Sequence, residues 1–190
     1  MMQPWQQPMR GPLAGVVDRV HAALPELRTA RLRLRPARIE DHATYAAIYG
    51  GPRWDHDEPV TEEDIWLDFC QLVAGWLLRG VGLMAIEPRD GGALLGFVLL
   101  NHEFGDAEME LGWMLTEAAE GQGIAFEAAE ALRAHGAGLG LDGVVSYISP
   151  GNARSARLAM RLGATRDPAA EAAVGDGTLV YRHPASGGQA

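Results

Sequence analysis

Two glycines, one residue apart, stand where an apolar run gives way to a segment rich in alanine and glutamate. The apolar run ends at Leu115, the glycines are Gly121 and Gly123, and the residues from Ile124 onward favour a helix by intrinsic propensity. Glycines at the start of a helix let backbone N–H groups converge without a Cβ in the way, and the positive end of the helix dipole faces the same point. A strand, loop and helix of this kind can bind a phosphate group.

Two common phosphate-binding motifs do not explain this loop. A P-loop needs Gly-Lys followed by Ser or Thr, and a dinucleotide-binding fold needs a third glycine and an acid that binds ribose. The sequence has neither at this position. A Gly-x-Gly turn alone is weak evidence, because many such turns are plain tight connections, so its meaning depends on the segments around it.

A second strand and helix follow downstream. Residues 143–149 are rich in β-branched side chains, which favours a strand. Asn152 comes just after this strand and Ser155 three residues later, and we expect Asn152 or a neighbour to cap the next helix. The chain therefore carries two polar helix starts, each preceded by a strand.

The strand that precedes the glycine loop carries two acids. In a strand over residues 107–115, Glu108 and Glu110 share one face. Carboxylates on an otherwise apolar central strand are costly unless they face a water-filled cleft or a partner. We expect Glu108 to be a charge at the rim. Glu110 is either a functional group that faces such a cleft or a structural acid paired with Arg31 or Arg33.

This order of elements and motifs resembles the GNAT superfamily of acyl-CoA-dependent N-acyltransferases, in particular its branch that acetylates ribosomal-protein N-termini at alanine or serine. The resemblance covers roughly residues 29–184. It rests on four motifs: the Arg-Leu alternation of residues 29–36, Glu-Leu-Gly-Trp at 110–113, Glu-Gly-Gln-Gly-Ile-Ala at 120–125 and Asn-x-x-Ser at 152–155.

The resemblance implies that acetyl-CoA is the co-substrate and that no metal is needed. The strand backbone would pair with the pantetheine arm, the N–H of Met114 or Leu115 would polarise the thioester carbonyl, the loop would hold the pyrophosphate, and Asn152 would bind the pantetheine amides. The implied cofactor-binding residues are Trp113, Met114, Leu115, Gly121, Gln122, Gly123, Ile124, Ala125 and Asn152.

The same resemblance suggests the catalytic groups. Many relatives place a tyrosine seven residues after the asparagine to protonate the thiolate, but here that residue is Ala159. The ribosomal-protein branch instead uses a serine three residues after the asparagine, so Ser155 becomes the candidate acid and Glu110 the candidate base. A second departure is Glu120, where the family usually has Gln, Arg or an aromatic residue. A carboxylate there repels a pyrophosphate unless its side chain turns outward.

Composition and charge narrow the class of protein. A chain of 190 residues with 47% apolar content fits one globular domain with a substantial core. The single cysteine, Cys70, excludes a disulfide framework and a cysteine-based metal cluster. No run is long enough for a membrane span and no export signal is evident, so we expect a cytoplasmic protein without a membrane partner. The net charge of −9 disfavours direct nucleic-acid binding and suits an amine acceptor.

The elements around the motifs point to an α/β (α+β) fold of the GNAT type. We expect a central mixed, mostly antiparallel twisted sheet of six to seven strands, splayed at strands 4 and 5 and flanked by about four helices. An apolar stripe over residues 13–24 predicts an added helix that packs on the domain or on a second subunit, in a possible homodimer. Residues 167–177 are expected to be a long loop.

Three divisions of the chain follow: residues 1–28 as a tail and added helix, 29–184 as the acyltransferase domain, and 185–190 as a flexible tail. Residues 53–59 are expected to form a loop near the acceptor, where Trp54, Asp55, His56 and Asp57 would recognise an ammonium group or simply form a solvated acidic surface.

Three functions remain open at this point. The first is an N-acetyltransferase that acts on a primary amine, such as a protein N-terminus, whose α-amine pKa near 8 suits a weak carboxylate base better than a lysine does. The second acetylates a small molecule, such as an amino acid, a polyamine or an antibiotic. The third is an acyl-CoA-binding module without catalysis, which the departures at Glu120 and Ala159 would favour.

Overall fold

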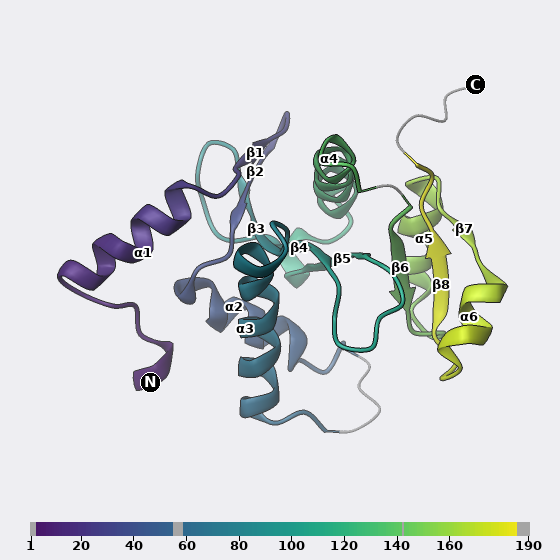
Figure 1. Cartoon of the computed structure of the whole chain (residues 1–190), viewed down its shortest axis with the longest axis horizontal. Helices are drawn as coiled ribbons and strands as arrows, with labels where there is room; N and C mark the ends of the chain where they lie inside the picture. The colour runs from purple at the N-terminus through teal and green to yellow at the C-terminus, as the bar shows by residue number, and fades with distance from the viewer. Residues whose placement is uncertain (1–2, 55–58, 142, 186–190) are drawn as a thin grey trace.

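The computed structural model describes residues 3–54, 59–141 and 143–185 (Figure 1). Within them the chain forms one eight-stranded sheet in the order β1-β2-β3-β4-β5-β6-β8-β7. The strands are β1 (Leu27–Arg28), β2 (Leu32–Pro36), β3 (Leu83–Pro88), β4 (Gly96–Asn101), β5 (Glu110–Leu115), β6 (Val145–Ile148), β7 (Thr165–Arg166) and β8 (Leu179–Arg182). The α-helices are α1 (Pro12–Ala22), α2 (His42–Tyr49), α3 (Glu62–Leu78), α4 (Ile124–Gly138), α5 (Ala153–Arg161) and α6 (Pro168–Val174).

The fold class predicted from the sequence is confirmed, with more elements than expected. The additional strands are the two-residue β1 and β7 at the sheet edges, which are too short to leave a periodic pattern. All adjacent strand pairs are antiparallel except β5 and β6, which run parallel. None of the helices in the described ranges is both long and apolar enough to cross a membrane.

Helices cover both faces of the central strands. On one face, α4 packs through Ala128 and Leu132 on a core that includes Val98 of β4. On the other face, α2 and α3 contribute Tyr45 and Phe69 to a second core cluster. Every residue of β4 is therefore buried, in agreement with the apolar side chains on both faces of this strand.

The start of α3 shows how local sequence sets an element. Thr61 is the N-cap, its hydroxyl accepts a hydrogen bond from the Asp64 N–H, and the Asp64 carboxylate accepts one from the Thr61 N–H. This is a capping box, with Asp in the third helical position where Glu or Gln is usual.

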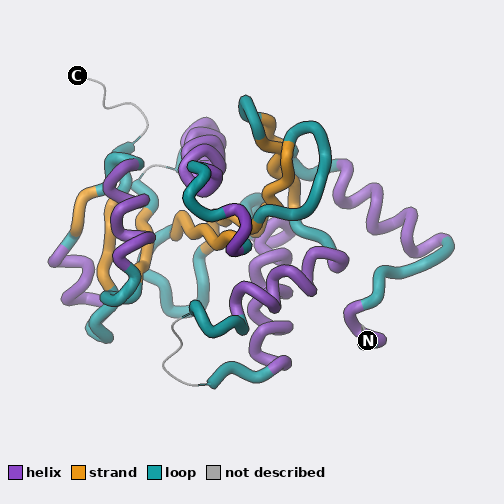
Figure 2. The backbone as a smooth tube through the Cα atoms, turned by 180° about the vertical axis from the view of Figure 1, so that it is seen from behind, coloured by secondary structure: helices purple, strands orange, loops and turns teal. Residues whose placement is uncertain are grey.

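The sheet opens between β5 and β6. These two strands are in register only at Glu110 and Val145, after which they diverge. Figures 1 and 2 show β1–β5 on one side of the opening and β6, β8 and β7 with α5 and α6 on the other. The short strand β1 precedes the first strand expected from the sequence, so the expected strands 4 and 5 are β5 and β6. The opening therefore lies where the sheet was expected to splay. The opening between these two strands borders the cavity described below.

Two predictions about single elements were wrong. The strand expected over residues 107–115 begins only at Glu110. Residues 167–177 are not a long loop, because α6 lies within them. Asp167 caps this helix by accepting from the Ala170 N–H, Pro168 occupies its first turn, and Gly175 ends it in the left-handed conformation. These capping signals were present in the sequence, but the helix is too short for an apolar stripe.

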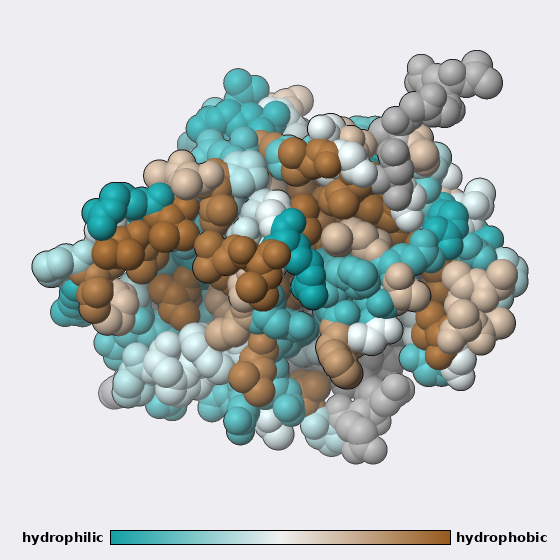
Figure 3. Space-filling model, viewed as in Figure 1, coloured by the Kyte–Doolittle hydropathy of each residue, from teal (hydrophilic) through white to brown (hydrophobic). Residues whose placement is uncertain are grey.

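The added helix α1 lies at one end of the molecule (Figure 1). Its apolar stripe is largely exposed, with Leu13, Val16, Val17 and Val20 between 41% and 55% accessible. Figure 3 shows apolar surface along this helix. The expected packing of the stripe on the domain is therefore not what the structure shows.

Candidate functional site

A cavity of about 1450 Å³ lies where β5 and β6 diverge. Its walls come from β5, the loop before α4, the end of β6 and the start of α5, together with side chains of α2 and α3. The glycine loop and the acidic strand that the sequence singled out therefore border one space.

The glycine loop presents free donors to this cavity. Gly121 and Gly123 have φ angles of +74° and +76°, a conformation that glycine adopts readily. Gly123 is the N-cap of α4 and has no side-chain cap, and the first helical hydrogen bond runs from the Glu127 N–H to its carbonyl. The N–H groups of Ile124 and Ala125 therefore have no hydrogen-bond acceptor within the helix, and they lie at the positive end of its dipole.

The start of α4 is tied to the loop between β1 and β2. The Glu127 carboxylate accepts from Arg31 Nε at 2.7 Å and from the Thr29 hydroxyl at 2.5 Å. Arg33 pairs with other acids as well, Glu26 at 2.5 Å and Glu87 at 3.2 Å. The structure thus places both arginines in ion pairs that do not involve Glu110.

Most of the implied cofactor-binding residues line the cavity. They are Trp113, Met114, Leu115, Gly121, Gly123, Ile124, Ala125 and Asn152. Gln122 is the exception, because its side chain turns back and donates to the Ala118 carbonyl at 2.7 Å.

Backbone direction distinguishes the residues of β5. The carbonyls of Met109 and Leu111 accept hydrogen bonds from β6 residues, so alternate residues of this strand point their backbone groups toward the opening. Trp113 and Leu115 follow in the same series, whereas Met114 directs its N–H toward β4. Of the two donors expected to polarise the thioester, Leu115 is the one on the open edge.

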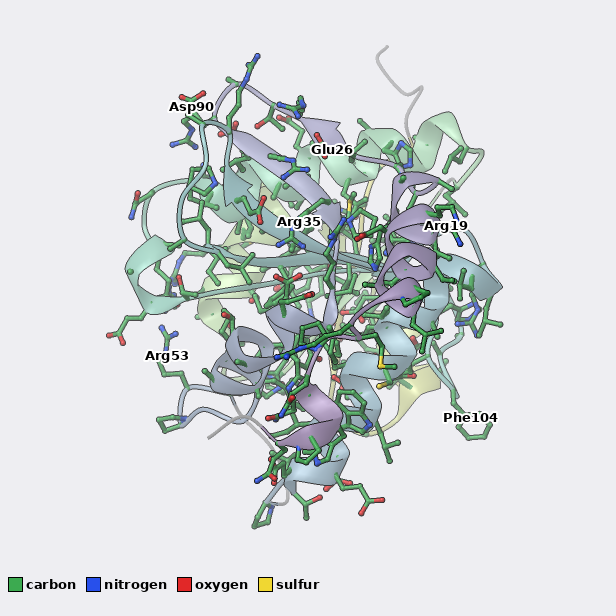
Figure 4. All side chains as sticks on the ribbon, turned by 90° about the vertical axis from the view of Figure 1, so that its left-hand side faces the viewer. Arg19, Glu26, Arg35, Arg53, Asp90 and Phe104 are labelled. Atoms are coloured by element: carbon green, nitrogen blue, oxygen red, sulfur yellow. The ribbon has the colours of Figure 1, made fainter. Side chains whose placement is uncertain are left out.

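The unusual Glu120 is neutralised by two arginines from opposite walls. Its carboxylate lies 2.7 Å from Arg53 of the segment after α2 and 2.6 Å from Arg154 at the start of α5. Figure 4 labels Arg53 on that segment. All three side chains line the cavity. The negative charge beside the glycine loop is therefore compensated by two positive ones, which explains how the departure from the family pattern is accommodated.

Glu110 is a half-buried acid in the wall of the cavity, at the start of β5. Burial raises its pKa to about 8, and repulsion from Glu103, Asp106 and Asp68 adds to the rise. A hydrogen bond from the Tyr147 backbone N–H opposes it. A carboxyl group with this pKa exchanges protons readily near neutral pH.

The acids around Glu110 come from separate elements. Asp68 lies on α3, and Glu103 and Asp106 lie on the loop between β4 and β5. The pKa of Glu103 is raised by burial and by repulsion from the other two. The Tyr45 hydroxyl donates to the Asp68 carboxylate. On the same loop, the Phe104 ring projects into solvent (Figure 4).

Sequence reasoning missed this acidic and aromatic part of the site. Tyr45, Tyr49, Asp68, Glu103, Asp106 and Tyr147 all line the cavity. Asp68 is one of several polar residues in the sequence of α3, and nothing near it in the sequence indicates that it lies close to the loop between β4 and β5.

Glu108 is separate from this group. It forms a bidentate ion pair with Arg182 of β8, at 2.6 and 2.8 Å, and this pair lowers the pKa of Glu108. The structure therefore shows Glu108 as a paired charge, and the two acids that stand close in the sequence have opposite electrostatic environments.

At the start of α5, Asn152 caps the helix as predicted. Its Oδ1 accepts from the Ser155 N–H at 3.0 Å, which leaves its NH₂ group as the donor toward the cavity it lines. Ser155 lines the same cavity. Ala159, by contrast, is fully buried in a cluster with Ile148 and Tyr181.

The acidic loop predicted near the acceptor is only partly described. Arg53 and Trp54 line the cavity, whereas Asp55, His56 and Asp57 lie outside the described residues. Within the described residues, no group of three or more His, Cys, Asp and Glu side chains is arranged to hold a metal ion.

Comparison with known proteins gives a consistent result. A family model described as an acetyltransferase (GNAT) domain matches residues 31–165. The chain is similar to the crystal structure of an acetyltransferase from Agrobacterium tumefaciens strain C58, with 40% identity and a TM-score of 0.79, over 85% of this chain and 95% of that one. It is also similar to a Bordetella pertussis protein assigned to the GNAT family, with 27% identity and a TM-score of 0.63, over 83% and 96% of the two chains.

A more distant structure shares the fold. RimL, the ribosomal L7/L12 α-N-protein acetyltransferase solved in complex with coenzyme A, has 20% identity and a TM-score of 0.64, over 84% of this chain and 98% of that one.

Proposed function

This chain belongs to the GNAT acetyltransferase family and is an acetyl-CoA-dependent N-acetyltransferase, and we propose that its acceptor is a primary amine bound beside Glu110. The observation that supports this acceptor is the pKa of about 8 for the half-buried Glu110 carboxyl group, in the wall of the same cavity that the glycine loop borders. An α-amine has a pKa near 8, so a proton passes between the two groups with little cost.

We assign the co-substrate to the groove between β5 and α5. The N–H groups of Ile124 and Ala125 would hold the pyrophosphate, and the open edge of β5 would pair with the pantetheine arm. The Asn152 NH₂ group would donate to a pantetheine carbonyl, since its Oδ1 already caps α5. Bound acetyl-CoA supplies the thioester carbon that the amine attacks.

Three groups of the chain would then act on the reaction. Glu110 accepts the proton that the amine loses, directly or through one water. The Leu115 N–H donates to the carbonyl oxygen as it gains negative charge. Ser155 donates its hydroxyl proton to the thiolate that leaves.

A protein N-terminus is the acceptor we favour, because its α-amine matches Glu110 in pKa. RimL acts on such an α-amine, although its 20% identity shows the fold alone and does not choose the acceptor. The N-terminal ammonium would be attracted by the carboxylates of Asp68, Glu103 and Asp106 before it loses its proton.

A small cationic amine is the second candidate. The carboxyl groups of Asp68, Glu103, Asp106 and Glu110 border the same cavity as several aromatic side chains, and this combination suits a polyamine that carries a further positive charge. An acceptor with one ammonium leaves most of these acids without a counter-charge.

The test is release of free thiol from acetyl-CoA across a panel of peptides that begin with Ser or Ala, amino acids and polyamines, with mass spectrometry to locate the acetyl group. Acetylation of peptide α-amines supports the favoured acceptor, and turnover with polyamines alone supports the second candidate. Acetylation on an oxygen, or no thiol release with any amine, contradicts the proposal.

A further inference from the structure

A buried side chain replaces the missing strand partner where the sheet opens. Beyond Glu110 and Val145, β5 and β6 no longer share a ladder. The next carbonyl on the open edge of β5, that of Leu111, accepts a hydrogen bond from the Ser146 hydroxyl at 2.6 Å. Ser146 belongs to β6, is 2% exposed and borders the cavity. A single hydroxyl thus continues the link between two diverging strands.

The Ser146 hydroxyl also forms a hydrogen bond with the His183 imidazole. The His183 Nε2 lies 3.0 Å from the Ser146 oxygen, and the imidazole is 1% exposed. The His183 backbone N–H donates to the Val144 carbonyl, which fixes the chain just after β8. On the far side of the ring, Nδ1 lies 3.5 Å from Arg133 Nη1, which donates to the Leu162 carbonyl at 2.7 Å. The links therefore connect α4, β8, β6 and β5.

The direction of these hydrogen bonds follows from the groups present. A carbonyl only accepts, so the single Ser146 hydroxyl proton points to Leu111. The Ser146 oxygen must then accept from His183, whose proton is on Nε2. Arg133 can only donate, which agrees with an unprotonated Nδ1. Burial and Arg133 lower the pKa of His183 to about 4, so the ring is neutral at physiological pH.

This direction is opposite to that of a nucleophilic Ser–His pair. In such a pair the imidazole accepts the hydroxyl proton, whereas here it donates one. Ser146 is thus not an activated nucleophile, although it is a hydroxyl beside an imidazole at the wall of the cavity.

His183 also contacts the next residue on the open edge. The Trp113 ring meets it edge to face, with centroids 6.4 Å apart at 89°. The imidazole therefore touches Trp113 directly and reaches Leu111 through Ser146. These are the two successive residues whose backbone groups face the opening.

We propose that His183, acting through Ser146, is a positioning residue for the co-substrate: it holds the Leu111–Trp113 edge of β5 in place for the pantetheine arm. This rests on the proposed function of the groove. Loss of the link would let β5 and β6 shift relative to each other, and the Trp113 N–H and carbonyl would no longer meet the arm of acetyl-CoA in register. Positioning of the acceptor beside Glu110 would change less.

The experiment compares three variants of the full chain. Ser146→Ala removes the hydroxyl, His183→Phe keeps an aromatic ring but removes the donor, and His183→Gln keeps an N–H donor. Ile86→Val, in the buried part of β3, is the control for a small loss of core packing away from the opening. Thermal unfolding, acetyl-CoA binding by calorimetry and steady-state kinetics are measured for each.

We expect Ser146→Ala and His183→Phe to raise the Kd and KM for acetyl-CoA by about tenfold, with kcat and the KM for the amine changed by less than about threefold. His183→Gln should recover most of the affinity, and Ile86→Val should leave it unchanged. Unchanged acetyl-CoA affinity in both donor-removing variants would overturn the role, as would an equal loss in Ile86→Val at similar thermal stability.

Wild-type protein that does not bind acetyl-CoA would instead refute the proposed function, so the two failures are distinguishable. If Ser146→Ala does not fold, the two His183 variants decide: affinity lost in His183→Phe and kept in His183→Gln supports the role, and equal affinity in both overturns it.

Discussion

Replacing Glu110 with glutamine removes a carboxyl group whose ionisation in the folded protein is costly. The folded pKa of about 8 stands against an ordinary value of 4.5. At about 1.4 kcal/mol for each pH unit, this difference corresponds to roughly 4 to 5 kcal/mol. Glutamine keeps the shape and an oxygen that can accept from the Tyr147 N–H, so the variant differs chiefly in charge.

The sign follows from proton binding. The folded state holds the Glu110 proton more tightly than the unfolded state. The contribution of this proton to the free energy of unfolding is therefore fully present below pH 4.5 and is lost as pH rises through 8. Between pH 4.5 and 8 the free energy of unfolding of the wild type should therefore fall relative to that of Glu110→Gln, by about 1.4 kcal/mol per pH unit. Above pH 8 the difference between the two should stay constant. Urea unfolding at a series of pH values measures this difference.

The activity of the wild type should rise with pH over the range in which its stability falls. As a base, Glu110 acts only when ionised, so kcat/KM of the wild type should fall on the acidic side of a pKa near 8. Glu110→Gln should lower turnover by about tenfold or more and lose this acidic limb, while acetyl-CoA still binds. The pH profile of kcat/KM and calorimetry are the measurements.

Glu108→Gln is the matched control. This acid lies two residues away but pairs with Arg182, which lowers its pKa. The control should therefore show no gain in stability with rising pH and little loss of turnover. A constant stability difference between wild type and Glu110→Gln from pH 5 to 9, or an unchanged acidic limb, would refute the reasoning about Glu110.

Three further changes test other parts of the site and fold. Ser155→Ala should lower kcat by about tenfold or more with the Kd for acetyl-CoA unchanged in calorimetry, and an unchanged kcat would remove the serine as the acid. Glu120→Gln should tighten acetyl-CoA binding by roughly three- to tenfold at low salt, because Arg53 and Arg154 lose their carboxylate partner beside the pyrophosphate; weaker binding would argue against repulsion. Thr61→Ala should lower the free energy of unfolding by about 1 kcal/mol in urea with normal acetylation, and unchanged stability would contradict the capping role.

Elements whose signals are local were predictable from the sequence. The capping box at Thr61, the left-handed glycines before α4 and the Asn152 cap of α5 depend on residues within one turn of each other. The apolar character of β4 likewise predicted its central place. The missed helix α6 also had local signals, at Asp167 and Gly175, but seven residues give too short a stripe to be recognised by periodicity.

The electrostatics of the site depended on contacts between distant segments. Nothing near Glu120 in the sequence indicated that Arg53 and Arg154 would neutralise it from two walls. Likewise, Glu108 and Glu110 look alike in the sequence, yet an arginine of β8 lowers the pKa of one and burial raises that of the other.

The sequence by itself determined the order of strands and helices, the glycine loop and the residue types available for chemistry. Backbone propensity, capping and hydrophobic periodicity act between near neighbours, and the amino-acid order specifies them directly. The tertiary structure alone decided which backbone groups of β5 face the opening, which acids surround Glu110 and how Ser146 and His183 hold the opening. The pKa of a buried group sums desolvation and charge over everything around it in space, and most of those groups lie far away along the chain.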